Sequence, residues 1–310
     1  MMLRPLNENI YLLKYISIMA KKLHIILPGG GVNGCFQAGF LYELHTKYKH
    51  MYEIYQLDCT SVGALNGLAL ITEKIDKLKE IWLSIKCLSD IFPPMTSVPI
   101  LVNTRAFLNS FYAKGLYSNE ALRKKVYSYD INDTPKEVMK KFNCVVTDIK
   151  KGEGVYINGL TSNIREYVLA SASPWIITPP QAIDSKLYTD GGLLDNFPIK
   201  MIDESKADLK IILGYDDSYE DISTEAGENI FTHLQNMIDI GRKTHYKNVT
   251  EKILNSDLIV IPLEDKVDFI EFNENIIKKG FEQGQIAAKK FVDTHLITSI
   301  EMVEIVDHKN

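Results

Sequence analysis

The sequence lacks several features that would place it in other classes of protein. Its 310 residues contain no uninterrupted apolar run of about 20 residues, the length that a transmembrane helix needs. Its net charge of −5 provides no overall positive field, which argues against a nucleic-acid partner. Four cysteines without a CxxC pair favour buried reduced thiols over a disulfide framework or a zinc site. We therefore predict a cytoplasmic protein whose contact with membranes, where it occurs, is local and peripheral.

The composition is typical of a globular protein with a large core. Hydrophobic residues make up 45% of the chain and charged residues 24%. We predict an N-terminal extension over residues 1–20 and a single catalytic domain over residues 21–310. The apolar stretch 10–19 resembles a signal core, but Lys14 interrupts it and no small-residue cleavage pattern follows. Met19 is an alternative start site, which would make the leader an extension.

Short apolar runs alternate with helical patterns along the chain. Runs without polar alternation indicate strands buried on both faces, and intervening helices indicate parallel crossovers. The pattern predicts a three-layer α/β/α sandwich with a mainly parallel central sheet. It also predicts a long helix over 274–294 with an apolar stripe facing the core. The expected strands cover residues 23–27, 54–59, 142–148, 209–214 and 257–263, and the stripe comprises Ile277, Phe281, Gly284, Ala288 and Phe291.

Two junctions that follow apolar runs carry candidate chemistry. Residues 28–34 read Pro-Gly-Gly-Gly-Val-Asn-Gly, and residues 59–63 read Cys-Thr-Ser-Val-Gly. A glycine run can present successive backbone N–H groups to a small anion, and a following helix N-terminus adds partial positive charge. A serine on a tight strand-to-helix turn is held out as an exposed nucleophile. The chain therefore contains candidate oxyanion donors and Ser61 as a candidate nucleophile.

Each motif has another interpretation when it is taken alone. A Walker loop would need Lys and Ser or Thr after the last glycine, but Cys35 and Phe36 follow Gly34. A dinucleotide loop shares the GxGxxG spacing and stays open, although it requires neither an elbow serine nor a distant Asp-Gly-Gly. Ser61 could cap a helix, and Asp190 could shape a turn. The combination of motifs favours ester hydrolysis over these interpretations.

The third motif, Asp190-Gly191-Gly192, completes a resemblance to the patatin-like phospholipase family. The resemblance runs from about residue 23 to residue 200, and residues 35–41, 145–148 and 170–175 also resemble the family. It implies a patatin-like fold, a lipid acyl hydrolase of phospholipase A or lysophospholipase type, and a phospholipid or other acyl-ester lipid as substrate. It implies no metal and no cofactor, and leaves the oligomeric state open. The roles implied are nucleophile for Ser61, general base for Asp190, oxyanion hole for Gly29, Gly30, Gly31 and Gly34, and motif support for Val62, Gly63, Gly191 and Gly192.

Two residues depart from the family pattern. Cys59 stands where the elbow usually has glycine, and Asn33 replaces a basic residue that is common in the glycine loop. Because neither change touches the nucleophile, the base or a backbone N–H group, we expect reduced or altered activity rather than none. The alternative is a catalytically weak patatin-fold protein that binds lipid or acts as a scaffold.

Two apolar segments and several histidines are further candidates for the site. The uncharged, proline-containing segments 91–101 and 174–180 are candidates for contact with lipid, or else buried connections. Histidines after Asp190 could complete a Ser–Asp–His triad in hydrolase order, but surface or packing roles are favoured for them, so we predict a dyad. These histidines are His233, His245, His295 and His308.

Overall fold

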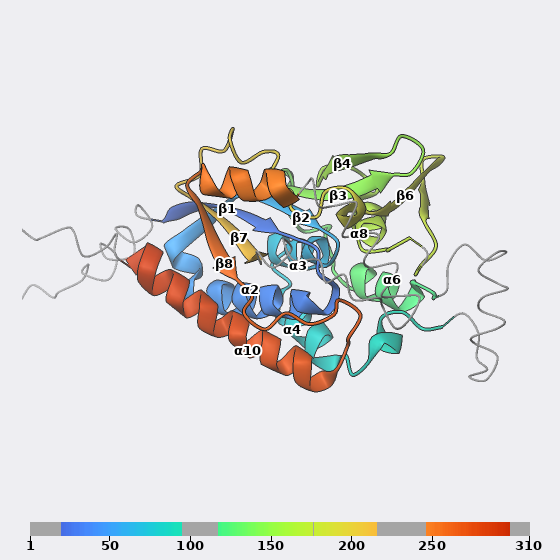
Figure 1. Cartoon of the computed structure of the whole chain (residues 1–310), viewed down its shortest axis with the longest axis horizontal. Coiled ribbons are helices and arrows are strands. Elements are labelled where there is room, and N and C mark those ends of the chain that lie inside the picture. The colour runs from blue at the N-terminus through green and yellow to red at the C-terminus, as the bar shows by residue number, and fades with distance from the viewer. Residues whose placement is uncertain (1–19, 95–116, 176, 216–245, 298–310) are drawn as a thin grey trace, which may run out of the picture.

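The fold is a mixed β-sheet with helices on both faces (Figure 1). The structure is a computed structural model that describes residues 20–94, 117–175, 177–215 and 246–297. Within these residues the sheet has eight strands in the order β5-β6-β3-β2-β1-β7-β8, and β4 pairs with β3 beside this path. The three-layer arrangement predicted from the sequence is confirmed.

The strands are β1 (Lys21–Leu27), β2 (Tyr52–Thr60), β3 (Phe142–Asp148), β4 (Glu153–Asn158), β5 (Gln181–Ile183), β6 (Lys186–Asp190), β7 (Leu209–Tyr215) and β8 (Leu258–Pro262). The α-helices of the described residues include α2 (Gly34–Tyr48), α3 (Val62–Ile71), α4 (Ile75–Ser84), α6 (Glu120–Tyr127), α7 (Lys136–Met139), α8 (Ile164–Ser171) and α10 (Glu274–Phe291). Residues 246–254 are also helical.

The five predicted strands are present, and all five pair in parallel with their neighbours as β3-β2-β1-β7-β8. Three antiparallel strands, β4, β5 and β6, were not predicted. They are short or half-exposed, and none forms a continuous apolar run. The sheet is therefore parallel in its centre and antiparallel at one side.

Strand β3 brings two other strands end to end. Residues 142–145 of β3 pair with β2, and residues 146–148 pair with β6. Because β4 pairs with residues 143–148 and overlaps both sets, β4 occupies one edge of β3, and β2 and β6 share the other. The C-terminal ends of β2 and β6 consequently meet beside Val145 and Val146.

Each face of the sheet has its own apolar cluster. On one face Leu23, Ile25 and Leu27 of β1 pack in the cluster that includes residues of α2, α3, α8 and α10. On the other face Ile26 packs with residues 197–202 and the helix of residues 246–254. Alternate residues of one strand thus contribute to opposite layers, as expected for a strand buried on both faces.

Helix α10 buries the predicted stripe against α2. All five stripe residues are buried, and the α-helix ends at Phe291 before a π-helical turn. A Cβ atom at Gly284 would lie 2.0 Å from the carbonyl oxygen of Phe36, so the two helices require glycine at this crossing. This confirms the prediction that the stripe is core and that Gly284 permits close approach.

Several predictions concern residues that the structure does not describe. These are the N-terminal extension apart from Ala20, segment 91–101 from Met95 onward, and the residues His233, His245 and His308. In the described residues no helix is long and apolar enough to cross a membrane. The four cysteines carry free thiols, of which Cys35, Cys59 and Cys144 are buried and Cys87 is exposed.

Candidate functional site

Ser61 lies on a sharp turn between β2 and α3. Its backbone has φ 54° and ψ −125°, a conformation that non-glycine residues adopt only when the surrounding structure imposes it. Helix α3 begins at the next residue, so the positive end of its dipole is directed at the serine. The turn therefore holds the hydroxyl where developing negative charge would be stabilised.

The Ser61 hydroxyl donates a hydrogen bond to Asp190. The distance from Ser61 Oγ to Asp190 Oδ2 is 2.6 Å, and the aspartate is 7% exposed. The other carboxylate oxygen, Oδ1, accepts from the backbone N–H of Gly192 at 2.7 Å. One oxygen is thus held by the aspartate's own turn, while the other faces the serine. The pair can transfer a proton from the hydroxyl to the carboxylate.

The Asp-Gly-Gly turn fits closely against β3. A Cβ atom at Gly191 would lie 2.2 Å from the carbonyl oxygen of Val145, so only glycine fits there. Both backbone groups of Asp190 are hydrogen-bonded: its N–H donates to the carbonyl of Ser173, and its carbonyl accepts from the Thr147 hydroxyl. These bonds orient the carboxylate toward Ser61.

Ser171 holds the backbone of Ser61 and was not predicted to do so. Its hydroxyl accepts from the Ser61 N–H at 2.9 Å and donates to the carbonyl of Val145 at 2.6 Å. Ser171 is fully buried at the end of α8. The signal in the sequence was its place within the family-like stretch 170–175, but only the fold brings it to the elbow.

The glycine loop lies directly against the elbow. A Cβ atom at Gly29 would lie 2.9 Å from Ser61 Cβ, and one at Gly34 would lie 2.4 Å from a Val62 methyl carbon. A Cβ atom at Gly63 would likewise clash with the carbonyl oxygen of Leu27. The two junctions read from the sequence therefore meet in space, and their glycines make that approach possible.

The N–H groups of the loop are not equivalent. Those of Gly30 and Gly31 have no acceptor among the described residues, whereas Gly29 donates to the Asn196 carbonyl and Gly34 donates within the loop. The assignment of the oxyanion hole to these four glycines stays a prediction, with the donors expected near Gly30 and Gly31. Gly29 and Gly34 provide close packing, and Gly30 and Gly31 remain as candidate donors.

Three buried amide side chains donate hydrogen bonds to carbonyl groups of the glycine loop. Gln37 donates to the carbonyl of Pro28 at 2.8 Å, and Asn66 donates to that of Gly34 at 2.9 Å. Asn196 donates to the carbonyl of Gly29 at 3.3 Å. None of the three was predicted as a site residue, although Gln37 lies in the family-like stretch 35–41. Asn66 offered a signal, because it is a polar residue in the otherwise apolar helix α3.

Cys59 is accommodated behind the elbow. Its side chain is fully buried, and a Cβ atom at Gly67 of α3 would lie 2.5 Å from its sulfur. Burial raises the pKa of the Cys59 thiol well above its ordinary value, so the thiol stays neutral beside the site. The departure from the family pattern therefore adds no charge.

Two histidines of the described residues, His24 and His295, have partners outside the dyad. His295 packs its ring on Phe291, with ring centroids 5.3 Å apart. Nε2 of His24 lies 2.8 Å from Oδ2 of Asp58, and both side chains are fully buried. Among the described residues no cluster of side chains could hold a metal ion.

An α/β sheet with a glycine loop beside a serine–carboxylate pair is the arrangement of a candidate ester hydrolase. Residues 25–203 match the family model of patatin-like phospholipases, and the chain belongs to this family. Membership supports hydrolysis of lipid esters as the activity at family level and confirms the resemblance seen in the sequence.

Two solved structures show a distant likeness. VipD from Legionella pneumophila is 15% identical, with a TM-score of 0.45, over 89% of this chain and 67% of that protein. The type III effector protein ExoU is 14% identical, with a TM-score of 0.36, over 91% of this chain and 53% of that protein. Because both scores are low, the family assignment depends on the family-model match.

Proposed function

We propose that the protein is a lipid acyl hydrolase that cleaves carboxylic esters through a Ser61–Asp190 dyad. The observation that carries the proposal is the 2.6 Å hydrogen bond from the Ser61 hydroxyl to the Asp190 carboxylate, made by a serine at positive φ before a helix. A serine placed in this way is activated by a base and exposed for attack. Membership of the family supports the proposed substrate, a phospholipid or other acyl-ester lipid.

The reaction proceeds in two stages. In the first, Ser61 Oγ bonds to the ester carbonyl carbon while Asp190 takes the hydroxyl proton; the carbon–oxygen bond to the alcohol then breaks, and the alcohol leaves with that proton. In the second, Asp190 takes a proton from water while the water oxygen bonds to the acyl carbon. The bond from that carbon to Ser61 Oγ then breaks, Asp190 returns the proton to Oγ, and the fatty acid leaves.

Gly30 and Gly31 act as donors to the tetrahedral oxyanion. Their N–H groups have no acceptor in the described part of the chain, and the adjoining Gly29 touches Ser61. Backbone donors that are already oriented gain most of their effect as charge develops in the transition state. The loop therefore contributes to turnover more than to binding of the lipid.

A fluorophosphonate probe tests the proposal. We expect the purified chain to gain one adduct on Ser61, identified by mass spectrometry, and to release fatty acid from mixed lipid vesicles. Ser61→Ala and Asp190→Asn each remove most of the turnover, and the double variant loses little more, because the two groups act as one unit. Full turnover by a folded single variant would refute the dyad.

A lipid-binding or scaffold function is the second candidate. The departures at Cys59 and Asn33 favour it. However, Gly67 leaves room for the Cys59 side chain, and Asn33 bonds to the backbone of Val267. Neither contact occupies the N–H group of Gly30 or Gly31. Vesicle binding without probe labelling or hydrolysis would support this candidate.

Two exposed apolar side chains near the dyad support peripheral contact with a lipid surface. Trp175 is 48% exposed and follows Ser173, whose carbonyl holds Asp190, and Leu194 is 39% exposed and follows the Asp-Gly-Gly turn. Tryptophan is favoured at the boundary between water and hydrocarbon. We therefore place the membrane-facing side at these residues.

A further inference from the structure

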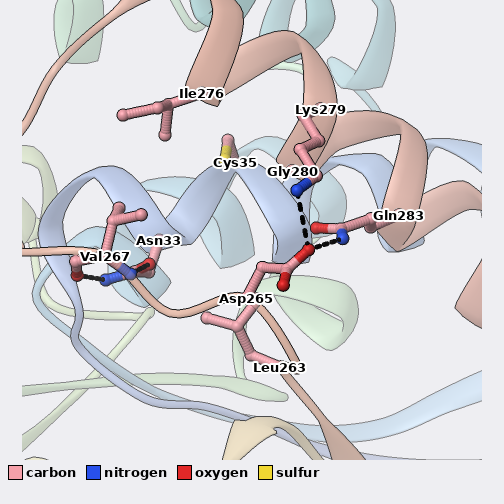
Figure 2. Close-up of a pocket in the computed structure, with 9 residues that line it drawn as sticks. All are labelled: Asn33, Cys35, Leu263, Asp265, Val267, Ile276, Lys279, Gly280 and Gln283. Atoms are coloured by element: carbon pink, nitrogen blue, oxygen red, sulfur yellow. Dashed lines mark hydrogen bonds and ion pairs between the residues drawn. The ribbon is translucent and has the colours of Figure 1, made fainter.

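Asn33 does not have the usual role of an asparagine at the start of a helix. It immediately precedes α2, where an asparagine side chain commonly accepts from a backbone N–H of the first turn. Here the side chain makes no such cap bond. Its amide is directed instead toward a segment that is more than 200 residues away in the sequence (Figure 2).

This segment, residues 263–269, is named the strap. Asn33 Nδ2 donates to the carbonyl of Val267 at 2.8 Å, and the N–H of Val267 donates to Asn33 Oδ1 at 3.2 Å. The same Nδ2 also lies 3.2 Å from the carbonyl of Gly30. One amide side chain therefore contacts both the glycine loop and the two backbone groups of a strap residue.

The strap touches the loop at two further points. Val32 N–H donates to the carbonyl of Phe269 at 2.9 Å. Gly31 has φ +57°, and a Cβ atom there would lie 2.0 Å from the Phe269 oxygen. Gly31, a candidate oxyanion donor, is consequently packed against the strap backbone.

The chemistry of the contact explains why asparagine occupies this position. The carboxamide has both a donor and an acceptor, so it can pair with the N–H and the C=O of Val267 together. A lysine or arginine at this position would offer donors only and could not accept from the Val267 N–H. The strap lies beyond residues 25–203, which match the family model.

We propose that Asn33 is a positioning residue that fastens the glycine loop to the strap and thereby fixes the direction of the Gly30 and Gly31 N–H groups. The role rests on the proposed function, because those groups act on the oxyanion of the hydrolytic reaction. Asn33 itself touches no reacting atom. Its removal should lower kcat and leave KM nearly unchanged.

A buried thiol reports on the fastening independently of activity. Asn33, Val267 and Cys35 line the same cavity, whose volume is about 110 Å³ (Figure 2). Cys35 is 2% exposed, so a thiol reagent reaches it only when the surrounding structure opens. Loss of the bonds from Asn33 to the strap should increase that opening.

The experiment uses the full chain with Cys87→Ser, which removes the exposed thiol. Asn33→Leu retains a similar shape without hydrogen bonds, and Asn33→Ala is the second variant should the first fail to fold. The matched control is Asn255→Ala, which removes an exposed amide whose side-chain hydrogen bond, among the described residues, is to the carbonyl of Glu251 in the preceding helix. Ester hydrolysis and the rate of labelling by an aromatic disulfide reagent are measured for each.

We expect the Asn33 variants to lose about tenfold or more in kcat, with KM within about threefold. Cys35 should label about tenfold faster, while the Asn255 variant matches the parent in both measurements. Unchanged labelling, or faster labelling with unchanged kcat, would overturn the proposal. If the parent chain hydrolyses no ester, the proposed function fails, and the labelling rate alone decides whether Asn33 fastens the loop.

Discussion

The sulfur of Cys59 fills the space that a side chain at position 67 would need. A Cβ atom at Gly67 would lie 2.5 Å from Cys59 Sγ and 3.2 Å from the ring of Phe142. Helix α3 therefore approaches β2 closely because position 67 lacks a side chain. The larger residue in the strand is matched by the smallest one in the helix.

This match predicts a strong coupling between the two positions. Gly67→Ala should destabilise the parent by about 1–3 kcal/mol, because the core is overpacked there. In a Cys59→Gly background the same change should cost less, giving a coupling of roughly 1 kcal/mol or more. Denaturant unfolding of the parent, the two single variants and the double variant measures this coupling. Equal costs in both backgrounds would mean that Cys59 and Gly67 are not matched.

Cys59→Gly by itself is expected to lower stability by about 1 kcal/mol, because it leaves a void and adds backbone freedom. Its activity should stay within about tenfold of the parent, since Ser61 and Asp190 are untouched. Thermal melts and steady-state assays check both. An inactive parent that becomes active with glycine would show that cysteine impairs the elbow.

Ser171→Ala should lower both the stability of the protein and its turnover. The variant leaves the Ser61 N–H and the Val145 carbonyl without their buried partner, at a cost of about 1–3 kcal/mol in unfolding free energy. It also releases the strained backbone of the nucleophile, so we expect kcat to fall about tenfold or more.

Two variants test whether the hydroxyl of Ser171 is responsible. Ser171→Thr keeps the hydroxyl and should recover most of the turnover. Ser173→Ala removes a hydroxyl that donates to the carbonyl of Leu169 and accepts from Asn119 Nδ2, with no bond to the elbow, and we expect it to change kcat by less than about threefold. Comparable losses in the Ser171 and Ser173 alanine variants would point to general destabilisation of α8.

Substitution of Gly31 and of Gly30 by alanine should lower stability to different extents. Gly31→Ala forces a side chain into positive φ and against the Phe269 carbonyl, so we expect a loss of at least about 2 kcal/mol in stability. At Gly30, φ is 171° and a Cβ atom would meet nothing closer than 3.5 Å, so alanine should cost less than about 1 kcal/mol. Equal melting temperatures would contradict this assignment.

Trp175→Ala should weaken binding to phosphatidylcholine vesicles by about threefold or more, because the lost indole is a favoured residue at the lipid interface. The matched control is Leu254→Ala, which removes an apolar side chain that is 78% exposed on the helix of residues 246–254. Sedimentation with vesicles measures binding. If the two variants bind equally well, the membrane-facing side lies elsewhere.

Burial of Cys35 predicts a loss of stability at alkaline pH. The surroundings raise the pKa of its thiol from 9.0 to about 12. Above pH 9.0 the unfolded chain releases this proton while the folded chain keeps it, so unfolding becomes more favourable as pH rises toward about 12. Unfolding free energies of the parent and Cys35→Ala should therefore converge above pH 9.0, by up to about 1.4 kcal/mol per pH unit. A constant difference between pH 8 and roughly 10.5 would exclude this linkage.

The central strands and the stripe of α10 could be predicted because their signals are local. A buried parallel strand is a continuous apolar run, and a helix facing the core repeats its apolar residues at three and four positions. Strand β4 lacked such a signal, since all of its residues are exposed or half-buried. The antiparallel side of the sheet therefore became visible only in the fold.

The candidate site likewise combines residues with a local signal in the sequence and residues that only the fold brings to the site. The order of the glycine loop, the elbow serine and Asp-Gly-Gly predicted Ser61 and Asp190. The positioning contacts of Asn33, Ser171 and Asn196 join segments that are between 110 and 234 residues apart. A hydrogen bond between a side chain and a distant backbone group leaves no pattern in a single sequence.

The chemical groups of the site were predictable from the sequence: a serine on a strand-to-helix turn, an aspartate followed by two glycines, and a run of backbone donors. Their meeting in space depends on the fold. Thr60, which precedes the serine, pairs with Val145, and Asp190 pairs with the adjacent Val146. Strand β3 thus sets the nucleophile beside the base, because β2 and β6 end against neighbouring residues of one edge, and register between strands depends on hydrogen bonds between distant parts of the chain.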